Sequence, residues 1–353
     1  MSTKTVGALI DDQKSELATL IVAEQWNRNP SFTDRYGSSG RSRCIQDVGY
    51  NLAYLSQSIA ADSEPLFLTY IKWVKSLFEG LKIPTIELSE SLSITAEILR
   101  SKMPGDEGLI PAKFLEAGIR ALDEAPSTPP SFFLDENPLS DFARRYLSNL
   151  RNEERSVASE MVLDAVKGGT NVKDIYLGVF EPSQREIGRL WQTNQMTVAE
   201  EHYCTAATQL IMSQLYPNIF SNKKNGRRMV AVCSGNELHE IGLHMVADIF
   251  EMEGWDTYYL GANTPTSTLC QTIEKRDPDI LAISGTMTFH VKLIEELIDT
   301  VKTALPGLRT KILVGGYPFI IEPELWSRIG ADGSARNAVK AVAAANRLIG
   351  SEV

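Results

Sequence analysis

The spacing of apolar residues changes along the chain and divides it into regions. Over the first 125 residues or so, apolar side chains recur every three or four positions, as on one face of an amphipathic helix. Ser63 is expected to cap one of these helices, with Pro65 in its first turn. The stretch 29–43 is polar and rich in Gly and Ser, which predicts a loop. The predicted helices are 44–61, a helix that follows Ser63 and has its apolar residues between 66 and 78, and 84–100.

A proline-rich segment, 125–130, interrupts the helical pattern and predicts a linker. Helical spacing then resumes from Pro138 to Phe220. Within it, Thr197 and Glu200 have the spacing of a capping box, so one helix should begin at Thr197 and the preceding one should end just before it. This middle region is predicted to be a small helical bundle.

After a polar, basic segment at 221–228, short apolar runs alternate with helical patterns. Such alternation predicts a parallel sheet with right-handed crossovers. The predicted strands are 229–233, 257–260, 280–283 and 311–314. The predicted helices are 239–253, 265–275, 289–305 and 335–349.

The predicted fold class is therefore α + α/β, with a helical N-terminal domain, a four-helix-bundle-type cap and a Rossmann-like parallel-sheet domain. A length of 353 residues suits two or three domains. The boundaries that the pattern predicts are 1–125, 126–137 for the linker, 138–222 and 223–353.

Charge and cysteine content exclude several classes of protein. The net charge of −10 argues against a chain that neutralises nucleic-acid phosphates, and the N-terminal region shows no winged-helix pattern. No apolar run approaches the ~20 residues that span a bilayer, and no signal peptide is recognisable. The four cysteines are widely separated, which predicts reduced thiols and a cytoplasmic protein. No nucleophile or acid–base pair stands out, so we do not expect an enzyme.

One of only four histidines, His239, lies between the first predicted strand and the following helix. Ligands of open α/β sheets bind at such strand ends. Glu237, two residues earlier, is placed to accept the distal N–H of a metal-bound imidazole, and Gly242 would let a large planar ligand approach the backbone. By contrast, His244 falls on a helix face with Glu240, Asp248 and Glu251, and we expect it to be solvated.

Two further strand ends carry suitable residues on the same sheet edge. Ser284 and Thr286 end the third strand with hydroxyl groups, and Gly315 and Gly316 end the fourth without side chains. Gly and Ser are common wherever strands turn into helices, so one such pair would mean little. Three sets at one edge predict a ligand site.

Together these residues resemble the cobalamin-binding domain shared by methionine synthase, corrinoid methyl carriers and cobalamin mutases, over about residue 140 to the C-terminus. The family pattern Asp-x-His-x-x-Gly, Ser-x-Leu/Thr and Gly-Gly is matched by the loop Glu237, Leu238, His239, Glu240, Ile241 and Gly242, and by Ser284, Thr286, Gly315 and Gly316. The resemblance implies that His239 is the lower cobalt ligand and that the nucleotide tail enters the sheet. Glu237 in place of Asp is the form seen in photoreceptor-type members.

The middle region is similar to the signature of the light-sensing CarH/LitR cobalamin photoreceptors. Trp191 is followed ten positions on by Glu201 and His202. In that family the tryptophan stacks on the 5′-deoxyadenosyl group and the Glu-His pair contacts it. The alternative is a core tryptophan and a solvated helix face.

The residue after Trp191 departs from that family, because Gln192 stands where a cobalt-binding histidine is expected. His202 is then the candidate second ligand on the cap. Thr288 and His290 follow the third strand and are included as expected corrin contacts, with a structural role at the helix start as the alternative for His290.

The N-terminal region looks like that of the photocobilins, which hold biliverdin beside cobalamin. Tyr50, Tyr54, Trp73 and Phe78 would line a slot for the bilin, Arg41 and Arg43 would meet its propionates, and Cys44 would attach it. Ordinary core aromatics and loop charges are the alternative.

These resemblances predict a signalling photoreceptor that carries adenosylcobalamin and, as a second chromophore, biliverdin. Light would break the Co–C bond, and cap movement would change the oligomeric state or the binding of a separate output protein. The alternative is a corrinoid methyl carrier of a methyltransferase system. A cobalamin sensor without photochemistry is a third interpretation.

Overall fold

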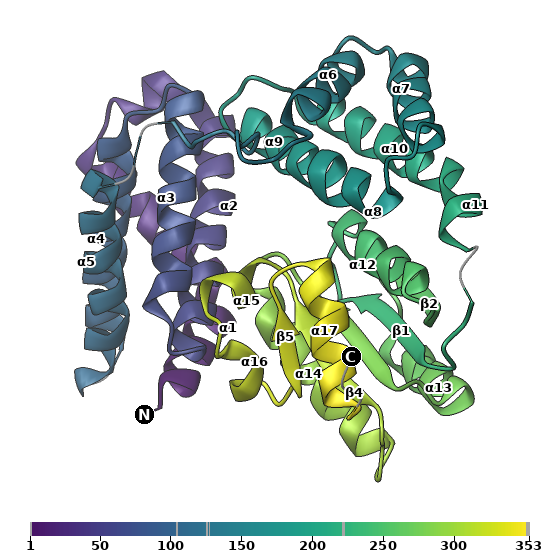
Figure 1. The fold of residues 1–353 in the computed structure, drawn as a ribbon. Coiled ribbons are helices and arrows are strands. Elements are labelled where there is room, and N and C mark those ends of the chain that lie inside the picture. Colours follow the sequence, from purple (N-terminus) through teal and green to yellow (C-terminus); the bar gives the residue numbers. More distant parts are fainter. Residues whose placement is uncertain (1, 104, 125, 127, 221–222, 351–353) are drawn as a thin grey trace. The chain divides into compact units, whose positions relative to one another are not determined.

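A computed structural model describes residues 2–103, 105–124, 126, 128–220 and 223–350 (Figure 1). The chain divides into two compact units, one of which comprises Met1–Ser127, Met287–Lys292 and Ile321–Arg328. The predicted domain boundaries at 1, 125, 222 and 353, and parts of the predicted linker and of the basic segment 221–228, lie outside the described residues. The division into domains therefore stays a prediction.

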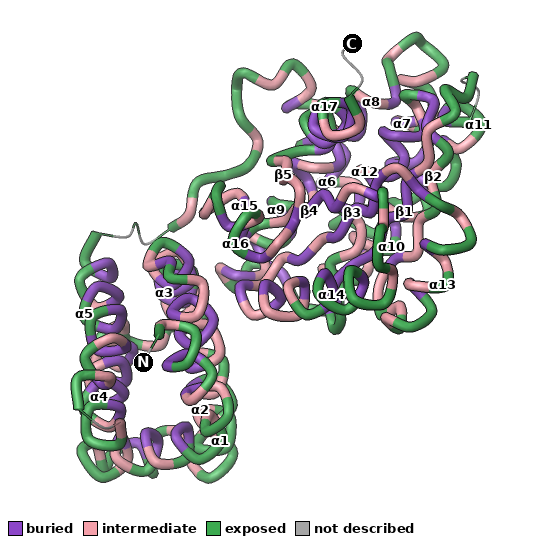
Figure 2. The backbone as a smooth tube through the Cα atoms, turned by 90° about the horizontal axis from the view of Figure 1, so that it is seen from below, coloured by how far each residue is buried: buried purple, intermediate pink, exposed green. Residues whose placement is uncertain are grey.

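The N-terminal region is helical, as predicted. Buried aliphatic and aromatic side chains give the N-terminal helices a core of their own, and Figure 2 shows buried stretches along each of them. Neither here nor elsewhere in the described residues is a helix both long enough and apolar enough to cross a membrane. The elements are α1 (Thr3–Arg28), α2 (Phe32–Ala60), α3 (Glu64–Gly80), α4 (Thr85–Lys102), the 3-10 turn η1 (Gly105–Gly108) and α5 (Leu109–Glu124).

The predicted loop at 29–43 is wrong, because α2 begins at Phe32. Phe32 is buried and its ring lies edge-on to those of Trp26 and Tyr36, with centroid distances of 5.2 and 5.4 Å. These aromatic contacts hold a polar stretch in place that has little apolar periodicity of its own. The one break is Gly37, whose φ of 61° kinks the helix at a residue without a Cβ.

The two predicted helix caps differ in the structure. Thr197 and Glu200 form the capping box: the Thr197 hydroxyl accepts from the Glu200 N–H at 3.2 Å, and the Glu200 carboxylate accepts from the Thr197 N–H at 2.6 Å. Ser63 occupies the N-cap position of α3 with extended backbone, but its hydroxyl makes no capping bond.

The middle region is a helical cap with four longer helices among its described residues. Tyr146 and Phe180 lie in its interior with no exposed surface, and the Tyr146 hydroxyl is 2.9 Å from that of Thr208. The elements are α6 (Ser140–Arg151), α7 (Arg155–Lys167), α8 (Val172–Ile175), the π-helical turn η2 (Tyr176–Phe180), α9 (Glu181–Gln192), α10 (Val198–Gln214) and α11 (Tyr216–Ile219).

The C-terminal region contains a parallel sheet with the order β2-β1-β3-β4-β5. The four predicted strands are present as β1 (Arg228–Cys233), β2 (Asp256–Gly261), β3 (Ile280–Ser284) and β4 (Lys311–Gly315). A fifth strand, β5 (Gly333–Ala335), was not predicted, because this three-residue edge strand contains no apolar run. The helices are α12 (Ile241–Met252), α13 (Thr266–Arg276), α14 (His290–Ala304), α15 (Tyr317–Ile321), α16 (Leu325–Arg328) and α17 (Ala338–Leu348).

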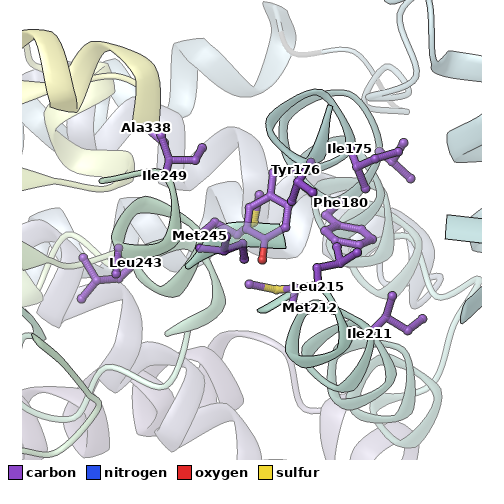
Figure 3. Close-up of a cluster of buried hydrophobic side chains, with 14 of the residues drawn as sticks. Ile175, Tyr176, Phe180, Ile211, Met212, Leu215, Leu243, Met245, Ile249 and Ala338 are labelled. Atoms are coloured by element: carbon purple, nitrogen blue, oxygen red, sulfur yellow. The ribbon is translucent and has the colours of Figure 1, made fainter. Parts of the chain in front are cut away.

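The cap and the sheet share one hydrophobic core. Alternate residues of a strand point to opposite faces, and on β1 Met229, Ala231 and Cys233 face this shared core. Helices α12 and α17 pack against each other on that face. Figure 3 shows Tyr176 of the cap beside Met245 of α12, and Phe180 and Ile249 belong to the same apolar cluster. The cap is thereby joined to the sheet by close apolar packing.

Candidate functional site

The loop between β1 and α12 presents an exposed histidine that is held by a buried carboxylate. Glu237 is fully buried, and its Oε1 accepts from the backbone N–H of His239 at 2.7 Å and lies 2.6 Å from its Nδ1. The side chain of His239 is 56% exposed. With Nδ1 bonded to the carboxylate, Nε2 is the ring nitrogen that a metal would meet, and the carboxylate raises its basicity.

Electrostatics favour the charged form of this imidazole in the absence of a metal. The hydrogen bond to Glu237 is the largest cause that raises the pKa of His239, and partial burial opposes it. The negative charges of Glu237 and Glu201 raise the pKa further. Glu201 belongs to α10 of the cap, so the structure brings this part of the cap near the His239 loop.

Glu237 also fastens its loop to the neighbouring strand. Its second oxygen, Oε2, accepts from the backbone N–H of Thr286, which follows β3. The backbone N–H of Ser234 donates to the carbonyl of Ser284 at 2.9 Å in the same place. The predicted residues Glu237, His239, Ser284 and Thr286 therefore do meet at one edge of the sheet.

The other predicted residues after β3 are less accessible. Thr288 is 5% exposed and His290 is 2% exposed. The Nδ1 of His290 accepts from the Met287 N–H at 3.2 Å, and its ring lies edge-on to Phe289 at 4.7 Å. The geometry fits the structural role at the start of α14, and a corrin contact for His290 or Thr288 stays a prediction.

The predicted glycines have different reasons to be glycine. Gly316 has a φ of 107°, and a Cβ there would lie 2.1 Å from the carbonyl oxygen of Gly285. This close backbone contact alone explains why residue 316 is glycine, whether or not a ligand binds. A Cβ at Gly242 would have no described atom within 4 Å, and one at Gly315 would be 3.7 Å from the Ala335 oxygen. Open space at Gly242 is consistent with close approach of a ligand.

The cap carries a second carboxylate–imidazole pair. Nδ1 of His202 is hydrogen-bonded to Glu201 Oε2, and the side chain of His202 is 75% exposed. Glu201 Oε1 accepts from the Thr205 hydroxyl at 3.2 Å. Trp191 lies partly buried in the last turn of α9, as predicted, and the following Gln192 is buried.

The prediction that His244 is solvated is wrong. Its Nε2 lies 2.9 Å from the Tyr216 hydroxyl of the cap, and its ring stacks on Tyr259 at 4.7 Å. Asp248, on the same helix face, is 5% exposed and accepts from the Tyr176 hydroxyl at 2.7 Å. The spacing of polar residues on α12 does not show that Tyr176, Tyr216 and Tyr259, which belong to other elements, cover this face.

The donor set at His239 suits a metal that arrives already chelated. Across the described part of the chain, no group of three or more His, Cys, Asp or Glu side chains could hold a bare ion. A single exposed imidazole with a carboxylate on its distal nitrogen is enough for cobalt already held in a corrin ring. The residues present therefore fit cobalamin.

Some of the N-terminal residues proposed for a bilin are already in contact with other side chains of this region. Tyr54 stacks on Tyr70 at 3.6 Å, and Arg41 lies 5.8 Å from the Trp26 ring. Tyr50 and Trp73 are exposed, whereas Phe78 is half-buried. Burial, followed by the charges of Asp47 and Glu87, raises the pKa of the Cys44 thiol to about 12, which disfavours the thiolate needed for covalent attachment.

Comparison with known proteins adds independent findings on this region. Residues 227–343 match the B12 binding domain. Residues 143–216 match a second family model with the same description. The matched segments lie in the sheet region and the cap, and they support the binding of cobalamin.

Similar proteins include dimethylamine corrinoid protein 3 of Methanosarcina acetivorans, 28% identical over 46% of this chain and 74% of that protein. A corrinoid protein of Desulfitobacterium hafniense is 23% identical over 56% of this chain and 92% of its own length. The fold is similar to that of the Methanosarcina barkeri monomethylamine corrinoid protein, with a TM-score of 0.53 and 19% identity over 60% of this chain and 99% of that one. These relatives support a corrinoid and give no support to light sensing or to biliverdin.

Proposed function

We propose that this chain is a corrinoid protein that binds cobalamin through His239 and carries a methyl group for a separate methyltransferase. The observation that carries the proposal is the buried Glu237 carboxylate on Nδ1 of an exposed His239, at a strand end within a B12-binding match. The similarity to a dimethylamine corrinoid protein supports a role in methyl transfer.

The chain's own residues would hold the cofactor in defined ways. Nε2 of His239 would bind the cobalt, and Glu237 would orient the imidazole and keep the proton on Nδ1. The loops at Ser284–Thr286 and Gly315–Gly316 would receive the nucleotide tail. Bound cobalamin would supply a cobalt centre able to accept and release a methyl group. All four cysteines are free thiols, which suits a cytoplasmic setting.

Reconstitution with hydroxocobalamin tests the ligand. The wild-type chain should give the spectrum of histidine-ligated cobalamin, and His239→Ala should not. Lys275→Ala is the control, because it lies at the end of α13 just before β3 and hence at the opposite edge of the sheet. A His239→Ala protein with the wild-type spectrum would refute the proposal.

Light sensing is the second candidate, and the cap favours it. Trp191 and the Glu201–His202 pair match the photoreceptor signature, and Glu201 lies near His239. In this alternative the cofactor is adenosylcobalamin, and the signal leaves through a change in homo-oligomer or partner binding. A bilin in the N-terminal helices would be a further chromophore.

The two candidates differ in their response to green light. The protein loaded with adenosylcobalamin should change its elution volume on illumination if it is a photoreceptor, and Trp191→Ala should alter that change. An unchanged elution volume favours the methyl carrier. Absence of a red-absorbing complex after addition of biliverdin would remove the bilin.

A further inference from the structure

The His239 loop is fastened on its other side by Glu240. The Oε2 of Glu240 accepts from the backbone N–H of Ala262 at 3.0 Å, and Ala262 directly follows β2. The carbonyl of Glu240 accepts from the Tyr259 hydroxyl at 3.4 Å. Two contacts therefore link Glu240 to the end of strand β2.

Glu240 stands at the N-cap position of α12, yet its side chain makes no capping bond. An acidic side chain at a helix start is usually explained by capping or by the helix dipole. Here the carboxylate instead reaches across to the neighbouring strand end.

Gly261 is matched to this carboxylate. It has a φ of 67°, and a Cβ there would lie 2.8 Å from Glu240 Oε2. Glycine at this position both permits the backbone conformation and leaves room for the oxygen. The end of β2 is thus shaped to receive Glu240.

The order of the strands shows that these contacts link the His239 loop to the strands on both sides of β1. Strand β1 lies between β2 and β3, and Glu237 links its loop to Thr286 on the β3 side. Glu240 links the same loop to Ala262 on the β2 side. His239 stands between the two carboxylates in the sequence, so the backbone on either side of it is tied to a different strand.

We infer that Glu240 is a positioning residue for His239, and that it holds the imidazole ready for the metal by fastening the loop to β2. The inference rests on the proposed role of His239 as cobalt ligand. In this role Glu240 acts through the backbone of the loop, which it fastens to Ala262. Its loss should let the loop move and lower the fraction of cobalamin bound through histidine.

The test compares Glu240→Ala with Glu240→Gln in the full chain loaded with hydroxocobalamin. Absorption spectra give the ratio of histidine-bound to histidine-free cobalamin, with His239→Ala as the histidine-free reference. Glu240→Ala should lower the ratio about fivefold, as expected for one lost hydrogen bond. Glu240→Gln should restore it, because its amide oxygen accepts the same bond.

The outcomes separate this inference from the proposed function. If His239→Ala keeps the wild-type spectrum, the ligand assignment fails. If His239→Ala loses the spectrum but Glu240→Ala keeps it, the positioning role fails. A Glu240→Gln protein as impaired as Glu240→Ala would also overturn the role of the hydrogen bond.

A second variant covers the case in which Glu240→Ala does not fold. Gly261→Ala should push the Glu240 carboxylate away and lower the same ratio. Hydrogen exchange of the cofactor-free chain should then rise over 236–242 and 259–263 and stay unchanged over β4. An unchanged ratio and unchanged exchange in Gly261→Ala would contradict the inference.

Discussion

The carboxylate of Glu237 is bonded to both the backbone and the ring of His239, at 2.7 Å to the N–H and 2.6 Å to Nδ1. The same carboxylate reaches the backbone of Thr286, 49 residues further along the chain. One buried side chain thus sets the orientation of the imidazole and joins two strand ends.

Replacement of this carboxylate should weaken cofactor binding. Glu237→Ala removes the group that orients His239, and loss of such a partner typically lowers metal affinity about 10- to 100-fold. Titration of the cofactor-free protein with hydroxocobalamin, followed by absorbance, measures the effect. Lys275→Ala should bind like the wild type, and equal affinity in Glu237→Ala would show that the carboxylate does not support the ligand.

A pair of glycine variants separates packing from ligand approach. Gly316→Ala places a Cβ 2.1 Å from a backbone oxygen at a φ of 107°, so we expect about 3 kcal/mol or more of destabilisation. Gly242→Ala meets no described atom within 4 Å and should leave stability nearly unchanged while it weakens cobalamin binding. Chemical denaturation measures the stability and cofactor titration measures the affinity for cobalamin. If Gly242→Ala lost stability and Gly316→Ala did not, the roles given to these two glycines would be refuted.

The hydrogen bond between Tyr176 of the cap and Asp248 of α12 should contribute to stability. Tyr176→Phe removes the hydroxyl that donates to the buried Asp248 carboxylate, which should cost about 1–3 kcal/mol. Tyr203→Phe is the matched control, since its hydroxyl donates to the Glu153 carbonyl at an exposed position. Urea unfolding of both variants checks the difference, and equal stabilities would mean that Tyr176 contributes only packing.

Buried thiols should make the protein less stable in alkali. Burial raises the pKa of Cys204 to about 11 and that of Cys233 to about 12. A thiol in the unfolded chain has a pKa near 8.5. The contribution of each buried thiol to the free energy of unfolding is therefore complete below that pH, and it is lost as the pH rises toward the pKa of the thiol in the folded protein. For Cys204 the loss should reach about 2 kcal/mol by pH 10.

Denaturation at pH 8 and pH 10 measures that loss. Cys204→Ala should reduce the difference in the free energy of unfolding between pH 8 and pH 10. The stability of this variant at pH 8 reports only the packing of the lost side chain. The same pH dependence in the wild type and the variant would contradict the explanation.

The sequence predicted those parts of the fold that depend on local patterns. Apolar runs such as 229–233 identify buried strands, and Thr197 with Glu200 identifies a helix start, because each signal lies within a few residues. The helix at 32–43 depends instead on the contact of Phe32 with Trp26 and Tyr36, which a short polar window does not reveal.

The candidate site divides in the same way. Glu237 and His239 are close in sequence, and their pairing could be predicted from spacing. The bonds from Glu237 to Thr286 and from Glu240 to Ala262 depend on strand order, which no local pattern contains. The burial of His244 was not predictable for a related reason, since Tyr216, which covers it, belongs to another helix.

The shared core makes the cap and the sheet depend on each other for stability. Apolar side chains of η2, α10 and α11 pack on those of α12, so lifting the cap away would expose this surface to water. A fragment that begins at residue 223 would carry the bare face of α12 and should aggregate, so the cap acts as a folding partner of the sheet.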